Sequence, residues 1–210
     1  MTMKRRPLDL DPNPSSVLVR VARLYSDIVS PPVVSAALGF SVVWVELPFW
    51  PGLAWAAAYG IMVSLIPICV VLFLLRRGVI GDLHISNRRE RHIPYLVGFA
   101  CALLALVVVS AFAGSRLLRS LAVCNTVGLA ALGSINTRWL ISNHTASVML
   151  AVTFAGFVFG ATVGVALMPL VGLTFAARLW LRRHSVAQLI AGLLVGAAPV
   201  LVLANLGYIG

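Results

Sequence analysis

Charged side chains are scarce in this chain. They make up 10% of its 210 residues, whereas a soluble domain carries about 25%. Hydrophobic residues make up 60% of the chain. Because so few charges cannot cover a surface that faces water, the composition excludes a soluble globular protein. It predicts an integral membrane protein that lies in a lipid bilayer.

Acidic residues and cysteines are rarer still. The six aspartates and glutamates form no paired-aspartate motif, which disfavours a prenyltransferase that uses such a pair. The three cysteines, Cys69, Cys101 and Cys124, all lie within apolar stretches, which predicts buried packing residues. The sequence has neither a disulfide framework nor a metal-ligand spacing. We therefore expect no metal and no other cofactor.

Long apolar stretches are what the chain has in abundance. A spanning helix needs about 20 residues, and each stretch comes close to that length. The boundary between the fifth and sixth stretches is soft, so one long bent segment is an alternative there. The fold class that follows is all-α, a polytopic membrane helix bundle with six or seven transmembrane helices. The seven stretches are residues 33–50, 52–75, 94–114, 118–137, 144–163, 165–182 and 186–206.

The N-terminal part differs from the rest in composition. Residues 1–15 are polar and contain proline, which predicts a disordered tail. Residues 16–30 mix apolar positions with two arginines and an aspartate, a pattern that suits a short helix lying in the membrane interface. We expect residues 16–210 to form a single integral membrane domain.

Glycines recur at four-residue spacing at Gly156, Gly160 and Gly164. Small residues at this spacing let two helices approach closely. Packing inside the bundle is the favoured interpretation. A seam between two copies of the chain, and hence a homo-oligomer, is the alternative.

The basic residues are unevenly distributed. If all seven stretches cross the membrane, the N-terminus and the connectors at 76–93, 138–143 and 183–185 share one side. Of the 16 lysines and arginines, all but Arg116 and Arg119 fall on that side. Positive charge marks the cytoplasmic side, and this explains the net charge of +10 without a nucleic-acid partner. We expect a protein of the bacterial plasma membrane whose N-terminus and site face the cytoplasm.

All four histidines fall on that same side. His84 and His92 flank an arginine-rich run, His144 follows a Ser-Asn pair, and His184 follows two arginines. A histidine can attack a phosphorus atom or protonate a leaving oxygen, and an arginine can hold phosphate oxygens with its two-pronged fork. These residue types at the ends of membrane helices predict chemistry on a phosphorylated lipid.

Three segments carry this chemistry, and each has a simpler explanation. In the middle segment, Ser142 or Asn143 can cap a helix whose N–H groups and dipole favour an anion, with His144 against the leaving oxygen of a phosphate. Ordinary capping beside an interfacial histidine is the alternative. For the segments at 82–94 and 177–188, the alternative is a basic cytoplasmic loop that only sets the topology.

Taken in order, the three segments resemble the type 2 phosphatidic acid phosphatase superfamily, an all-helical membrane family, over residues 82–206. Its third motif is Ser-Arg, five residues, His, three residues, Asp. Here Arg178 and His184 are in register, Ala177 replaces the serine, and Gln188 replaces the aspartate.

The first two motifs match in part. The family's second motif is Ser-Gly-His, and here Ser142 and His144 match while Asn143 replaces the glycine. Its first motif is Lys, six residues, then Arg-Pro. That motif aligns in two ways, either with His84, Arg91 and His92 at the lysine, arginine and proline positions, or with Asp82 and Arg89 at the first two.

The resemblance implies a two-step phosphatase mechanism that needs no metal. His184 would attack phosphorus and form a phosphohistidine, and His144 would protonate the departing lipid alkoxide. Water would then hydrolyse the phosphoenzyme. The substrate would be a membrane lipid, either similar to phosphatidic acid or a polyprenyl phosphate. The residues expected to bind its phosphate are Arg178, Arg91, His84, Ser142 and Asn143.

Gln188 sets this chain apart from the family pattern. A glutamine can orient His184 through its carbonyl oxygen but supplies no negative charge, and in a serine-protease triad the change from Asp to Asn costs about 10⁴-fold in kcat. Asp82 or Glu90 could reach in as a substitute. A lipid phosphate phosphatase is the expected function. A catalytically impaired relative that binds or moves phosphorylated lipids is the alternative, and an unrelated transporter or channel comes third.

Overall fold

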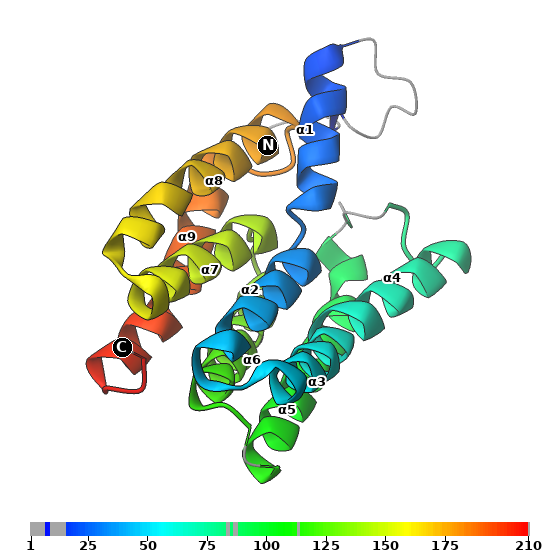
Figure 1. The fold of residues 1–210 in the computed structure, drawn as a ribbon. Helices are drawn as coiled ribbons and strands as arrows, with labels where there is room; N and C mark the ends of the chain where they lie inside the picture. The colour runs from blue at the N-terminus through cyan, green and yellow to red at the C-terminus, as the bar shows by residue number, and fades with distance from the viewer. Residues whose placement is uncertain (1–6, 9–15, 83–84, 86–87, 113, 210) are drawn as a thin grey trace.

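The computed structural model describes residues 7–8, 16–82, 85, 88–112 and 114–209, and these form an all-α bundle (Figure 1). A π-helical turn at Ile61–Leu65 joins α3 to α4, and a 3₁₀ turn at Arg88–Arg91 leads into α5. The helices are α1 (Val17–Ile28), α2 (Pro31–Glu46), α3 (Phe49–Gly60), α4 (Ile66–Arg76), α5 (His92–Ala111), α6 (Arg116–Asn136), α7 (Asn143–Phe159), α8 (Ala161–Trp180) and α9 (Val186–Asn205).

The apolar stretches of the sequence are all helical, and their ends lie within four residues of the predicted limits. By length and composition, five helices in the described part of the chain can cross a membrane, with α3 and α4 taken as one. The number rises to six if α1 and α2, which are bent by 47°, form one span. The remaining apolar helix, α7, has 17 residues. The protein is thus an all-α polytopic membrane bundle, as predicted.

The break between α7 and α8 falls at Gly160. Its φ of 101° is a conformation that only glycine adopts easily. Gly156 and Gly164 stand four residues to either side, and a Cβ atom built on Gly164 would lie 2.9 Å from the Cα atom of Gly156. The chain therefore folds back into an antiparallel hairpin here, which excludes the alternative of one long bent helix. The glycine spacing lets α7 and α8 pack closely within the bundle.

The core of the bundle is built around α6. This helix packs against α5 on one side and against α2 and α9 on the others. Cys124 on α6 and Cys101 on α5 are buried, as predicted, but Cys69 is exposed and its prediction as a buried residue is wrong. The reason is that α4 lies at the edge of the bundle (Figure 1). Fully buried residues of this core include Val42, Val43, Tyr59, Leu118, Leu121, Ala122 and Phe154.

The alternating directions of the helices bring distant connectors to one end of the bundle (Figure 1). The α1–α2 junction, the start of α5, the start of α7 and the α8–α9 turn all lie there. The predicted disordered tail, residues 1–15, falls outside the described residues except for Pro7 and Leu8. The N–H group of Leu8 donates a hydrogen bond to the carbonyl oxygen of Leu181, 3.1 Å away, at this same end.

Candidate functional site

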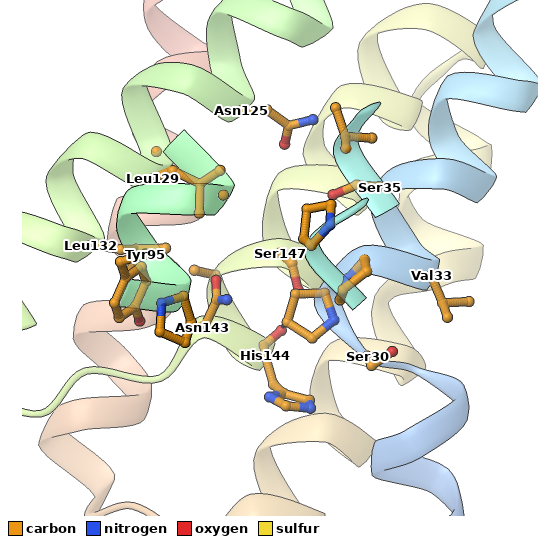
Figure 2. Close-up of a pocket in the computed structure, with 18 of the residues that line it drawn as sticks. Ser30, Val33, Ser35, Tyr95, Asn125, Leu129, Leu132, Asn143, His144 and Ser147 are labelled. Carbon is orange, nitrogen blue, oxygen red and sulfur yellow. The ribbon is translucent and has the colours of Figure 1, made fainter. Parts of the chain in front are cut away.

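A cavity of about 430 Å³ opens at the end where the connectors gather. Much of its wall is apolar. Figure 2 shows His144 and Ser30 at one end of the cavity and Asn125 at the other. Residues of α4, α6 and α7, among them Ile68, Leu129 and Leu150, form part of the apolar wall. The cavity therefore combines polar groups at both ends with a largely apolar wall. Its basic and imidazole-bearing residues are Arg91, His144, Arg178 and His184.

Arg178 is the most deeply buried of the cationic groups in the cavity. It sits in the last turn of α8 and is only 1% exposed. Arginine keeps its charge in proteins, and a buried charge needs compensation by hydrogen bonds or an opposite charge. A guanidinium in this position favours an anion in the cavity beside it.

Arg91 joins two of the three connectors. Its Nε atom donates a hydrogen bond to the carbonyl oxygen of Ile85, at 2.7 Å, and its Nη1 atom donates to that of Ile141, at 3.2 Å. Burial lowers the pKa of Arg91 from its usual value, but an arginine remains protonated at neutral pH. The guanidinium is therefore a rigid positive group at the cavity wall.

His184 lies in the turn between α8 and α9 and is 6% exposed. Its Nδ1 atom is buried and has no hydrogen-bond partner among the residues that the structure describes. Burial lowers the pKa of His184 well below its usual 6.5, and the charges of Arg178 and Arg91 lower it further, while a hydrogen bond with Gln188 opposes them. The imidazole is therefore neutral at pH 7, the form that carries a lone pair for attack.

The turn that presents His184 has an unusual backbone. Arg182 adopts a left-handed conformation with a φ of 57°, which costs a residue other than glycine about 1–2 kcal/mol. This conformation lets the N–H group of Arg183 donate to the carbonyl oxygen of Arg178, at 3.0 Å. His184 is thereby turned back toward the end of α8 and its arginine.

Gln188, at the position of the family's aspartate, belongs to a capping box. Its Oε1 atom accepts a hydrogen bond from the N–H group of Ser185, at 3.0 Å, and the Ser185 hydroxyl accepts one from the N–H group of Gln188, at 3.4 Å. The side chain thus stabilises the first turn of α9. The Ser-x-x-Gln spacing is the sequence signal for this box.

The second motif forms the first turn of α7. The hydroxyl of Ser142 accepts a hydrogen bond from the N–H group of Thr145, at 3.4 Å, which makes it the N-cap residue. Asn143 and His144 line the cavity, whereas Ser142 is fully buried outside it. The Nε2 atom of His144 lies 3.2 Å from the carbonyl oxygen of Ser26. The α7 N-terminus and one imidazole are therefore both directed at the cavity.

The two acidic residues considered as substitutes for the family's aspartate have other contacts. The Oδ1 atom of Asp82 lies 3.0 Å from the Nη1 atom of Arg183 in an ion pair. The Oε2 atom of Glu90 accepts a hydrogen bond from the N–H group of Gly81, at 2.7 Å. His84, predicted to bind phosphate, lies outside the described residues. His92 is exposed at the start of α5 and is not part of the cavity wall.

The contribution of α1 and α2 to the site was not predicted. Asp27 and Ser30 line the cavity, and Ser26 meets His144. The sequence signal was the Pro31–Pro32 pair, which breaks the helix beside these polar residues. In the described part of the chain, no three His, Cys, Asp or Glu side chains are grouped so that they could hold a metal ion.

The chain was compared with family models, with curated proteins and with solved structures, and none of them matches it. The resemblance to the type 2 phosphatidic acid phosphatases therefore depends on the motif residues of the sequence alone.

Proposed function

We propose that the protein is a membrane phosphatase, a divergent relative of the type 2 phosphatidic acid phosphatases, that hydrolyses a lipid phosphate. One observation carries the proposal. Two buried arginines and two buried histidines from three distant segments line a single cavity whose inner wall is apolar. An anionic headgroup fits the arginines, and a hydrocarbon chain fits the remaining wall.

The chemistry proceeds in two steps. The unprotonated ring nitrogen of His184 attacks phosphorus, the bond from phosphorus to the lipid oxygen breaks, and His144 donates its proton to that oxygen. Arg178 and Arg91 hold the non-bridging phosphate oxygens as charge develops on them. In the second step His144 takes a proton from water, the resulting hydroxide displaces His184 from phosphorus, and inorganic phosphate leaves. The products are a lipid alcohol and phosphate.

The site faces the cytoplasm in this proposal. The connectors at the cavity end carry most of the basic residues, while Arg116 and Arg119 start α6 at the opposite end. Because short basic loops stay on the cytoplasmic side, the cavity opens toward the inner leaflet.

The test is phosphate release from phosphatidic acid and from a polyprenyl phosphate, measured in detergent with a chelator present. We expect the wild type to release phosphate and His184→Ala to lose on the order of 10³-fold or more, because the nucleophile is gone. His92→Ala is the matched control, since it removes an exposed histidine outside the cavity, and it should retain activity. Absence of phosphate release from either lipid, or release that survives His184→Ala, would overturn the proposal.

A second candidate is a relative that binds phosphorylated lipids without turnover. The observation that favours it is that residue 188 is a glutamine, which has no carboxylate, and that its Oε1 atom accepts a hydrogen bond from the N–H group of Ser185 in the α9 capping box. In that case phosphatidic acid binds the wild type with no phosphate release, and Arg178→Ala abolishes binding. Gln188→Asp would then be expected to start turnover.

A further inference from the structure

The break between α1 and α2 has a defined local cause. α1 ends at Ile28 and α2 starts at Pro31, and the two helices are bent by 47°. A proline disfavours the helical conformation for the residue that precedes it. Ser30 is accordingly extended, with φ −81° and ψ 153°. Pro31 therefore favours an end of the helix at Ser30, and the extended backbone there places the break between α1 and α2.

This break releases a backbone carbonyl group into the site. The last hydrogen bond of α1 runs from the N–H group of Val29 to the carbonyl oxygen of Tyr25. The next bond of a continuous helix would join the N–H group of Ser30 to the carbonyl oxygen of Ser26. The Ser26 oxygen instead lies 3.2 Å from the Nε2 atom of His144, a residue 118 positions away.

A carbonyl oxygen can only accept a hydrogen bond, so the Nε2 atom of His144 must be the donor. We propose that the Ser26 carbonyl is the positioning group of His144. It accepts a hydrogen bond from Nε2–H in both the neutral and the protonated ring, so the proton that the imidazolium transfers to the leaving lipid oxygen is the one on Nδ1. The role of His144 as proton donor rests on the proposed function. The assignment of the Nε2–H tautomer depends only on the contact with the Ser26 carbonyl. A carbonyl in this position orients the ring and stabilises it when it is protonated.

α1 is fixed to the bundle at the residue next to Ser26. The Tyr25 hydroxyl donates to the carbonyl oxygen of Leu170, at 2.9 Å, and lies 3.0 Å from Oγ1 of Thr174 on α8. Thr174 precedes Arg178 by one helical turn. The anchor of α1 therefore holds the Ser26 carbonyl at a fixed place relative to the arginine that the proposed mechanism uses.

The charged and titratable groups that line the cavity with His144 come from several elements. They are Asp27 at the α1–α2 junction, Arg91 before α5, Tyr95 on α5, Arg178 at the end of α8 and His184 in the following turn. The Ser26 hydroxyl is buried and has no hydrogen-bond partner in the described part of the chain. It is the backbone carbonyl, and not the serine side chain, that carries the proposed role.

The first experiment needs no substrate. ¹⁵N NMR of histidine-labelled wild-type protein in detergent distinguishes the two neutral tautomers, and His144→Gln assigns the signals. We expect His144 as the Nε2–H tautomer. In Pro31→Ala, Ser30 can become helical and its N–H group can take the Ser26 carbonyl, so the signals should shift toward a tautomer mixture. Ser26→Ala and Pro32→Ala are matched controls, because each leaves the carbonyl and Pro31 in place, and both should keep the wild-type signals.

The second experiment uses two phosphate esters. A lipid alkoxide needs a proton as it leaves, whereas p-nitrophenolate does not. With Pro31→Ala, and with Tyr25→Phe, which removes the α1 anchor, we expect hydrolysis of phosphatidic acid to fall about 10-fold or more in kcat. Hydrolysis of p-nitrophenyl phosphate should change far less.

The outcomes separate this inference from the proposed function. An Nδ1–H tautomer of His144 in the wild type overturns the positioning role, whatever the activity. The same conclusion follows if Pro31→Ala loses the α1–α2 break and still gives the wild-type signals. An Nε2–H tautomer that responds to Pro31→Ala in a protein without phosphatase activity supports the Ser26 contact and overturns only the function.

Discussion

Arg183 and Asp82, 101 residues apart in the chain, form an ion pair in which the Nη1 and Oδ1 atoms are 3.0 Å apart. The arginine side chain is 2% exposed and the aspartate 16%. The pair ties the connector before α5 to the turn that carries His184. It thereby holds together two of the three segments that converge on the cavity.

Breaking this pair should destabilise the protein. Asp82→Ala leaves the buried Arg183 charge without its carboxylate, and the expected loss is about 3–5 kcal/mol of unfolding free energy. The measurement is unfolding in mixed detergent micelles. The double variant Asp82→Ala/Arg183→Met removes both charges and should be more stable than the single variant. A single variant as stable as the wild type would show that the pair contributes nothing.

Replacing Arg182 by glycine should give a more stable protein than replacing it by alanine. Its φ of 57° costs any residue with a Cβ atom about 1–2 kcal/mol, which glycine avoids. We expect Arg182→Gly to be about 1 kcal/mol more stable than Arg182→Ala, although both variants lose the same charge. Thermal unfolding of the two variants side by side measures the difference. Equal stability would mean that the turn relaxes away from the left-handed conformation.

Gly192 on α9 should not tolerate a methyl group. A Cβ atom there would collide with the Thr145 side chain and would lie 2.6 Å from the carbonyl oxygen of Ser142, both at the start of α7. We expect Gly192→Ala to cost about 1–3 kcal/mol and to lower phosphate release, because α7 carries His144.

Gly172 on α8 provides the control for this substitution. A Cβ atom at Gly172 meets nothing within 4 Å, so Gly172→Ala should be neutral or slightly stabilising through helix propensity. Equal stability of the two alanine variants would contradict close packing of α9 against the start of α7 at Gly192.

The protonation of His184 should make stability depend on pH. Burial, then Arg178 and Arg91, lower the pKa of this residue in the folded protein below 6.5, the value in the unfolded chain. The unfolded state therefore binds more protons, and stability rises with pH. The contribution is fully present above pH 6.5 and is lost as the pH falls below it.

His184→Asn removes this titration. Its unfolding midpoint should vary less between pH 6.5 and pH 5 than that of the wild type, while His92→Asn, which replaces an exposed histidine, should follow the wild type. For the same reason, the fall in the rate of phosphate release that accompanies protonation of His184 should occur well below pH 6.5. A fall at pH 6.5 or above would contradict a neutral, buried imidazole.

Much of the site could be anticipated from residue type and connector order. His144, His184, Arg178, Arg91 and Asn143 were predicted and all line the cavity. Arginine and histidine beside the ends of apolar helices have few roles in a membrane protein other than setting the topology or binding an anion. Their residue types therefore indicated a candidate anion site. The predicted role of Gln188 depends on its position in the motif, whereas its capping box depends on the local Ser-x-x-Gln spacing.

The sequence determines membrane insertion, the helix limits and the gathering of connectors at one end. A bilayer requires long apolar helices of nearly fixed length, and consecutive spans alternate in direction. Only the tertiary structure decided that Asp82 pairs with Arg183 and that the Ser26 carbonyl meets His144. Both contacts depend on how helices far apart in the chain pack sideways. Hydrophobic pattern leaves that choice open, since lipid and protein neighbours satisfy an apolar face almost equally well.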